Sequence, residues 1–363
     1  MSIDFSAERW LAIKDNYRRW WAGELDRPLI QIELSGRAPE REKPDIPWHH
    51  FSSFYDFSVP AGKIVDWFEY NLESTVFLGD SFPHVIPYFG PGVTAAYLGA
   101  ELVNSPDEST AWFRPRAEIP ASKLRLRLLP DEPWWRRTIE IYRAAQARFK
   151  GLVQLDMTDL GGNLDIAASF RPGSGLLLDL YDCPDDVTRL AWESHDAWWR
   201  CFDAIRREAG LNPGYTAWTP IFSEQPYYML QCDFCYMIGP EMFAKFVLPE
   251  LRASCKKLTN SFYHLDGPGA LPHLDALLDI PELKGIQWVP GDGQPDITRW
   301  PEVYRKIRAA GKLIQIFPGQ APRGWDALEI IADQIGSAKG IIMIAGGAME
   351  DADKAMRLLA RFS

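Results

Sequence analysis

Short hydrophobic runs alternate with amphipathic segments of helical length along most of this chain. From residue 151 to 363 the alternation is regular, which predicts a parallel sheet whose strands are each followed by a helix. The strands expected there are "LVQLDM", "YMLQCDFC", "SFYHLD", "GIQWVP", "KLIQIFP" and "GIIMIAGG". Two earlier runs, "PLIQIEL" and "TVFLGD", bring the number of expected strands to eight.

The first 150 residues are less regular. The opening segment predicts a helix capped by Ser6, with apolar residues at helical spacing. Residues 28–150 then combine early strands with insertions rich in proline, glycine and aromatic residues. Eight strand and helix units over residues 1–363 favour a single α/β domain, a closed (β/α)8 TIM barrel. We expect it to carry an N-terminal helical extension and a long insertion between its early strands, with regular units over 151–363.

Polar residues recur at every second position of the expected strands. Successive side chains of a strand point to opposite faces, so these polar residues share one face. They are Gln31, Glu33, Gln154, Asp156, Gln231, Asp233, His264, Asp266, Gln287 and Gln315. The opposite face is mostly aliphatic and must pack under the helices. We therefore expect the polar face to point into the barrel.

A polar barrel interior has two explanations. One is a buried hydrogen-bonded network without a ligand. The other is a binding site for a polar substrate or a metal, which would offset the cost of removing polar groups from water. We favour a ligand site, because the catalytic groups of such barrels gather at the carboxyl ends of the strands. We regard the histidines His84, His195 and His273 as structural or surface residues.

Composition excludes several functional classes. The net charge is −10, so the chain lacks the basic excess typical of nucleic-acid-binding proteins. Five cysteines are too few for a disulfide framework in a chain of this length. The sequence shows neither a signal peptide nor a long apolar run, so we expect a cytoplasmic protein without membrane contact. The 15 tryptophans suit either a core or a pocket for ring-shaped ligands.

Several segments resemble the uroporphyrinogen decarboxylase superfamily. They are "TDLGGNLDIAASF", "MIGPEMFAKFVLPEL", "FYHLDGPGALPHLDALLDI", "IQWVPG" and the opening "ERWLAIKDNYRRWWAGELDRPLIQI". The likeness is closer to the corrinoid-dependent methyltransferase branch. The resemblance implies a (β/α)8 barrel enzyme. It also implies a catalytic aspartate after the second strand, where "FLGDSF" places Asp80.

The resemblance also implies a metal. Members of the methyltransferase branch often bind zinc through a His-x-Cys motif at a strand end and a later cysteine, and the zinc acts as a Lewis acid. His264 matches this motif, whereas Asp266 replaces the cysteine and no cysteine follows Cys255. Zinc accepts nitrogen, oxygen and sulfur donors, so the chain could bind zinc through a different set of ligands. Its expected ligands are His264, Asp266 and either Cys235 or Cys232. The alternative for the cysteine pair is two small buried residues.

The leading hypothesis is an enzyme that moves a methyl group from a small methylated substrate to a corrinoid. No Asp-x-His-x-x-Gly motif for holding cobalamin occurs, so a separate protein would carry the corrinoid. Asp80 and Asp233 would serve in acid/base catalysis, and Trp218, Tyr263 and Trp288 would shape the pocket. The alternatives are a decarboxylase-like, lyase or hydrolase activity on a carbohydrate or aromatic acid, and a non-catalytic small-molecule-binding protein. A homodimer is a candidate assembly.

Overall fold

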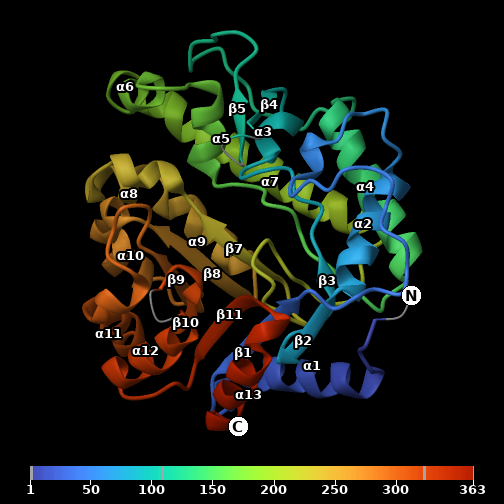
Figure 1. The fold of residues 1–363 in the computed structure, drawn as a ribbon. Helices are drawn as coiled ribbons and strands as arrows, with labels where there is room; N and C mark the ends of the chain where they lie inside the picture. Colours follow the sequence, from blue (N-terminus) through green and yellow to red (C-terminus); the bar gives the residue numbers. More distant parts are fainter. Residues whose placement is uncertain (1–2, 106, 108–109, 322–323, 363) are drawn as a thin grey trace.

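The fold is built on a central, mostly parallel sheet, as the alternation of strands and helices predicts (Figure 1). The computed structural model describes residues 3–105, 107, 110–321 and 324–362. The seven strands follow the order β2-β1-β11-β10-β9-β8-β7. They are β1 (Leu29–Ser35), β2 (Thr75–Gly79), β7 (Tyr227–Gln231), β8 (Asn260–Asp266), β9 (Gly285–Val289), β10 (Leu313–Ile316) and β11 (Ile341–Ala348).

Two small sheets accompany the central one. The first is a parallel pair, β3 (His84–Val85) and β6 (Gln154–Leu155). The second is an antiparallel hairpin, β4 (Glu101–Ser105) and β5 (Thr110–Arg114), which projects at the top of Figure 1.

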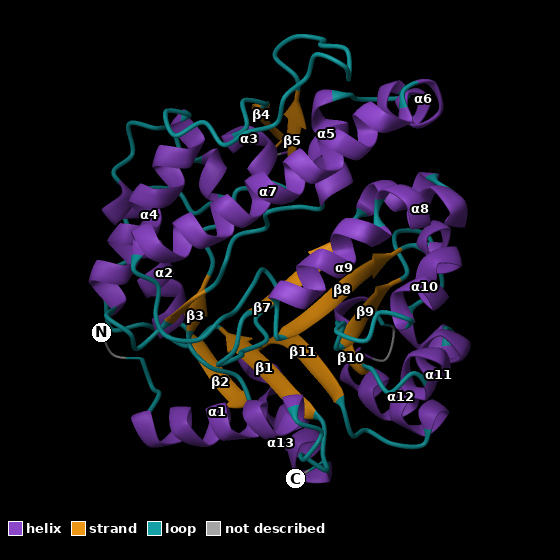
Figure 2. Cartoon of the chain, turned by 180° about the vertical axis from the view of Figure 1, so that it is seen from behind, coloured by secondary structure: helices purple, strands orange, loops and turns teal. Residues whose placement is uncertain are grey.

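The helices form two groups, one on each side of the strands as Figure 2 is viewed. The upper group comprises α2 (Ala61–Glu73), α3 (Thr94–Tyr97), α4 (Pro133–Phe149), α5 (Asn163–Phe170), α6 (Gly175–Asp182) and α7 (Pro184–Ala209). The second comprises α8 (Pro240–Phe246), α9 (Leu248–Lys257), α10 (Leu274–Leu278), α11 (Pro301–Ala309) and α12 (Ala327–Ile335). At the lower end lie α1 (Ala7–Trp21) and α13 (Ala352–Arg361). Among the described residues, we find no helix with both the length and the apolar character needed to cross a bilayer.

Helix α1 covers the amino ends of the central strands. Its predicted cap is confirmed, since the Ser6 side chain accepts a hydrogen bond from the Arg9 backbone N–H. The Trp20 ring stacks on Phe262, early in β8, with centroids 6.0 Å apart, and Trp10 stacks on Phe82 at 5.0 Å. The carboxyl ends of β7 and β8, where a site was expected, therefore lie at the end of the sheet away from α1.

The strand predicted at "TVFLGD" forms, but its assignment as a parallel strand was wrong. Strand β2 runs antiparallel to β1, with Gly79 opposite Gln31. The chain then turns and enters β3, which pairs parallel with β6. Hydrophobic periodicity indicates an extended segment but carries no information about its direction, which explains the error.

Two other segments are shorter than their patterns predict. The strand expected through "YMLQCDFC" ends at Gln231, and Asp233–Met237 form a 3-10 helix, η3. The amphipathic segment 239–258 forms two helices, α8 and α9, divided at Val247, because Pro249 cannot donate a backbone hydrogen bond and fits only the first turn of a helix. The segment 214–222 is a loop with one isolated bridge from Tyr215 to Ser223.

The alternating polar face is confirmed by the strand register. Gln231 pairs with His264, His264 with Gln287, and Gln287 with Gln315. Side chains of paired residues in neighbouring strands lie on the same face, so these four form a continuous row across β7, β8, β9 and β10. Gln287 and Gln315 are completely buried, and Gln231 nearly so.

The β3–β6 pair is joined to both edges of the parallel strands. On the β7 side, the Tyr228 hydroxyl accepts a hydrogen bond from the Leu160 backbone N–H at 2.7 Å and donates one to the Thr158 carbonyl. On the β1 side, the His84 ring contacts the Glu33 carboxylate at 3.0 Å. Side chains, rather than a strand ladder, make both connections.

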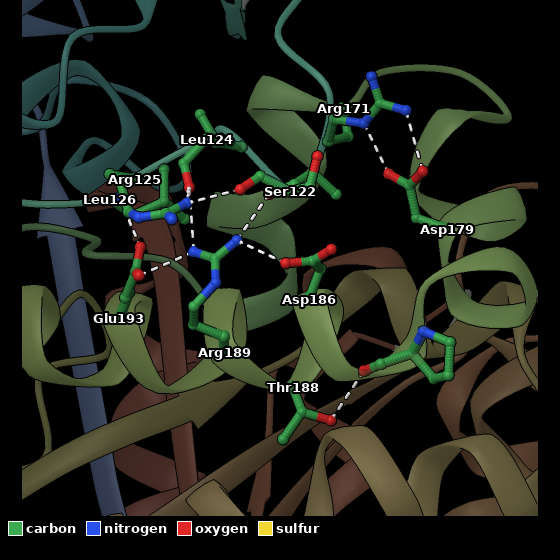
Figure 3. Close-up of polar contacts among 12 residues, drawn as sticks. Ser122, Leu124, Arg125, Leu126, Arg171, Asp179, Asp186, Thr188, Arg189 and Glu193 are labelled. Atoms are coloured by element: carbon green, nitrogen blue, oxygen red, sulfur yellow. Dashed lines mark hydrogen bonds and ion pairs between the residues drawn. The ribbon is translucent and has the colours of Figure 1, made fainter.

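Arginine side chains fasten the long insertion to helix α7 (Figure 3). The Arg189 guanidinium donates to the backbone carbonyls of Ala121 at 2.7 Å and Leu124 at 3.0 Å. It also pairs with Asp186 and Glu193 on its own helix. The other Glu193 oxygen accepts from the Leu126 backbone N–H, so one arginine and one glutamate hold the whole of segment 121–126.

We predict that Arg189→Ala lowers the free energy of unfolding by about 1–3 kcal/mol, because two backbone carbonyls lose a charged donor. The partial exposure of this arginine keeps the expected loss within that range. Urea denaturation followed by circular dichroism measures the change. The matched control is Arg207→Ala, near the end of the same helix, where the side chain is 70% exposed. Equal destabilisation by the two variants would contradict the role given to Arg189.

Candidate functional site

Three acid and imidazole side chains meet at the carboxyl ends of β7 and β8. Asp233 begins η3 and is separated from the end of β7 by Cys232 alone. His264 and Asp266 lie near the carboxyl end of β8. Each offers one ligand atom, and these three atoms lie within 4.8 Å of one another. Asp233 is exposed and the other two are partly buried. The predicted convergence of these three residues is therefore observed.

The His264 ring is oriented by the polar row. Gln287 Oε1 lies within hydrogen-bond distance of His264 Nδ1, and the Trp218 ring packs edge-on against the imidazole with centroids 5.3 Å apart. With Nδ1–H donating to the amide oxygen, Nε2 keeps its lone pair. Burial lowers the pKa of His264, against the opposing effects of Gln287 and Asp266, so the ring is neutral at pH 7. A neutral, oriented imidazole is the form that binds metals.

Asp233 is positioned by α5, a helix of the upper group. The Asp165 carboxylate, on α5, accepts hydrogen bonds from the backbone N–H groups of Asp233 at 3.0 Å and Phe234 at 2.7 Å. It thereby caps the start of η3. The approach depends on Gly162, since a Cβ there would lie 2.3 Å from the Gln231 carbonyl oxygen and 2.4 Å from Asp165 Oδ2. The helical group thus sets the position of Asp233.

Three carboxyl groups near the cluster hold protons more tightly than an isolated aspartate. Burial, followed by repulsion from Asp233, raises the pKa of Asp165 to about 7. Burial raises the pKa of Asp159 to about 7, with a further contribution from Asp233. Although the residue is exposed overall, desolvation by neighbouring protein atoms, followed by repulsion from the Asp266 carboxylate, raises the pKa of Asp233 to about 6. A cation or a proton would relieve this crowding of negative charge.

The cluster suits a divalent cation with nitrogen and oxygen ligands. Zinc binds imidazole nitrogen and carboxylate oxygen at about 2.0–2.2 Å, which separates tetrahedral ligand atoms by roughly 3.3 Å. The bound of 4.8 Å on the present separations is wider, so side-chain rotations would draw the ligand atoms together. His264, Asp266 and Asp233 are the residues that could hold the ion.

The cysteines do not join this cluster. Cys235 Sγ lies 3.8 Å from the Tyr263 hydroxyl, and Tyr263 occupies the opposite face of β8 from His264. The hydrogen bond that the Cys232 thiol donates to Cys235, together with burial, raises the pKa of that thiol well above its usual value. The structure therefore does not bring the expected cysteine ligands, Cys235 or Cys232, into the cluster of Asp233, His264 and Asp266. Strand β7 ends before Asp233, so strand alternation does not place Cys235 on the same face as Asp233.

Asp80 lies at the other end of the molecule. Its carboxylate forms a two-point ion pair with Arg27, at 2.7 and 2.9 Å, and accepts from the side chain of Asn16 on α1. It also accepts from the Ile30 backbone N–H at the start of β1. The direction of β2 carries Asp80 to the amino end of the sheet. The expected catalytic position was wrong, and Asp80 instead ties α1 to β1.

Other expected pocket residues divide between the two faces. Trp218 lies against His264, as proposed. Trp288 and Tyr263 lie on the helix-facing side of the sheet, where Trp288 packs against Trp300 with centroids 5.1 Å apart, so neither reaches the cluster. Gln31 lies near α1, where its amide nitrogen contacts the Tyr17 hydroxyl and donates to the Pro220 carbonyl.

Several inner polar atoms lack a hydrogen-bond partner within the described part of the chain. They are Gln31 Oε1, Gln154 Nε2, Gln231 Oε1, Gln287 Nε2 and both polar atoms of the Gln315 side chain. Buried polar atoms are nearly always hydrogen-bonded, so such a group indicates contacts with water or a ligand.

A second polar centre was missed from the sequence. The ring of His84, on β3, lies between two carboxylates: Nδ1 contacts Asp156 at 2.5 Å and Nε2 contacts Glu33 at 3.0 Å. Burial opposes the charge, but Asp156 and Glu33 together raise the pKa of His84 well above 6.5. Glu33 and Asp156 were both expected in the site. The period-two pattern would have added His84 had the parallel strand been placed at 84–85.

His195 and His273 are structural, as predicted. His195 lies within a buried network with Glu250 and Ser254, and His273 stacks on Phe243. Asp159 and Asp165 were also missed, because they follow a short strand in a loop and on a helix, where no alternation marks them.

No protein-family model and no curated protein matches this chain. The arrangement of the site's own side chains therefore provides the argument for function.

We predict that His84 stays protonated well above pH 6.5 and that Glu33→Gln lowers its pKa by about one unit or more, since one of two stabilising anions is removed. Nitrogen chemical shifts of the imidazole, followed by NMR against pH, measure both values. Glu302→Gln, which removes an exposed carboxylate on α11, is the control. A wild-type His84 that titrates near 6.5 would contradict the arrangement.

Proposed function

We propose that this protein is a metal-dependent enzyme acting on a small molecule at the carboxyl ends of β7 and β8. The convergence of Asp233, His264 and Asp266 is the observation that carries the proposal. A neutral imidazole and two carboxylates make a suitable ligand set for a divalent cation such as zinc. The unpartnered glutamine atoms along the inner face support binding of a polar substrate beside it.

In this proposal the fold is an irregular (β/α)8 barrel of the uroporphyrinogen decarboxylase superfamily. The eight parallel strands would be β1, β3, β6, β7, β8, β9, β10 and β11, with β2 as an antiparallel addition. The side-chain bridges at Tyr228 and at His84 support this closure, because they join β6 to β7 and β3 to β1. A closed barrel would turn the polar row inward.

The first candidate reaction is transfer of a methyl group from a small methylated substrate to a corrinoid held by a separate protein. In this reaction the bond between the methyl carbon and its heteroatom would break, and the heteroatom would keep the electron pair and take up a proton. The reduced corrinoid of the separate protein would supply the electron pair for the new bond to the methyl carbon. The cation, when bound, would polarise that leaving atom. Asp159 and Asp165, whose carboxyls have pKa values near 7, are the groups able to hold a proton at neutral pH.

The second candidate is a lyase, decarboxylase-like or hydrolase reaction on a carbohydrate or aromatic acid. The absence of a thiol from the cluster, among the residues described, favours it. Carboxylate and imidazole ligands suit metals that bind hydroxyl and carboxylate oxygens of a substrate.

We predict that the protein binds about one zinc ion and that His264→Ala or Asp266→Asn weakens binding by roughly a hundredfold or more. Substitution of a residue that only hydrogen-bonds to a metal ligand already lowers metal affinity about 10–100-fold, so loss of a ligand itself should lower it further. Calorimetric titration with zinc, with manganese for comparison, measures the affinity. Elemental analysis of protein purified without chelator or affinity-tag metal gives the stoichiometry.

The matched controls are Cys232→Ala and Cys235→Ala. Both thiols are buried outside the cluster, so both variants should bind zinc as the wild type does. Loss of binding in a cysteine variant, or wild-type affinity in both His264→Ala and Asp266→Asn, would refute the proposed site.

We predict methyl transfer to reduced free cobalamin from a methylated thiol, amine or phenol in the presence of zinc, followed by the absorption change of the cobalamin. His264→Ala should lower the rate by at least about a hundredfold. Turnover of hydroxy acids or glycosides without methyl transfer would instead select the second candidate. Metal binding without any turnover would favour a binding protein.

A further inference from the structure

A cavity of about 220 Å³ opens beside the His84 centre. It lies where β1, β2 and β3 approach helix α2, and Glu33 and His84 form its polar wall. Aromatic side chains make up half of the rest of the lining: Trp48, His50, Phe68, Phe77 and Tyr88. The other half is aliphatic except for Asn71 and Thr75. The residues proposed to hold the metal do not line it.

The polar wall offers one free acceptor. Both His84 nitrogens are engaged, one by Asp156 and one by Glu33. Glu33 Oε1 receives His84 and lies 3.5 Å from the Ser81 hydroxyl. For Glu33 Oε2, the structure records no partner among the described residues, and the side chain is about one-third exposed. A ligand here can therefore donate a hydrogen bond to Glu33.

The volume limits the size of the ligand. A cavity of about 150 Å³ can hold benzene, so 220 Å³ accommodates one ring with one or two substituents. A tetrapyrrole is far too large for it. Flat aromatic walls favour an aromatic ring through stacked and edge-on contacts. A sugar of similar size would place several of its hydroxyl groups against these rings and aliphatic side chains, at a cost in desolvation that the polar groups of Glu33, Asn71 and Thr75 offset only in part.

We propose that this cavity is a binding site for a single phenolic ring, whose hydroxyl group donates to Glu33. The Asp156–His84 pair holds the Glu33 carboxylate in place, since the imidazole bridges the two acids. Glu33 is a binding residue and His84 a positioning residue in this site. The proposal goes beyond the proposed metal-dependent function, because ring binding here requires neither the metal nor turnover.

The test uses the full chain and three probes in calorimetric titrations: 4-methylphenol, its methyl ether 4-methylanisole, and glucose. The ether keeps the ring and removes the donor. We expect saturable binding of 4-methylphenol and at least about tenfold weaker binding of the ether, because a hydrogen bond to a charged acceptor is lost. Glucose should not bind. Equal affinity for phenol and ether, no phenol binding, or binding of glucose alone would overturn the proposal.

Two variants locate the binding event. Glu33→Gln removes the charge while keeping the shape, and should weaken 4-methylphenol binding by about tenfold. Asn71→Phe places a ring in the cavity from the partly exposed side of α2, and should abolish binding. Glu302→Gln is the control, with wild-type affinity expected. Wild-type affinity in Asn71→Phe would place the ring elsewhere and overturn the proposal.

Thermal melting shows whether each variant is folded. If a variant does not fold, the comparison of 4-methylphenol with 4-methylanisole on the wild-type protein tests the proposal. Zinc affinity should be unchanged in Asn71→Phe, which separates failure of this site from failure of the metal site.

Discussion

A row of buried polar side chains on one face of a parallel sheet is the constraint on which the rest of this structure depends. Strands of such sheets are usually apolar on both faces, and an unpaired buried polar group costs about 1–3 kcal/mol. Gln231, His264, Gln287 and Gln315 nevertheless occupy one continuous row, fixed by strand register. A slip of one residue in any strand would turn its polar residues under the helices and its apolar residues inward. The row therefore fixes the register of four strands and aims His264 at the carboxyl ends of β7 and β8.

The site also depends on the helical group that packs on the other side of the strand ends. Asp233 follows a strand but is held by Asp165 of α5, and the close approach of α5 requires Gly162. Helix α5 in turn packs on α7, which Arg189 fastens to segment 121–126. The position of Asp233, one candidate metal ligand, thus depends on the packing of α5 against α7 and on the hydrogen bonds of Arg189. Substitutions far from the strand ends can alter the cluster by moving this layer.

His264 is neutral and His84 is positively charged at neutral pH, because the groups around the two rings differ. His264 faces an amide, so the cost of burying a charge dominates and its pKa falls. His84 lies between two carboxylates, whose combined attraction exceeds the same cost, and its pKa rises. The neutral ring can bind a cation, whereas the charged ring ties Asp156 to Glu33. The chain thus has two polar centres with different chemistry.

The sequence by itself determined the α/β class, the cap and buried face of α1, and the shared polar face of the strands. It also determined that His264 and Asp266 lie on the same face of one strand. These follow from local periodicity, which a single strand or helix expresses without its neighbours. Tertiary structure alone decided the direction of β2, which moved Asp80 into an ion pair with Arg27 and brought His84 to Glu33. It also decided that Asp233, rather than a cysteine, joins His264, because the end of β7 and the cap from Asp165 depend on a helix distant in sequence. Strand direction and loop position are set by contacts between segments far apart in the chain, and no pattern within one segment encodes them.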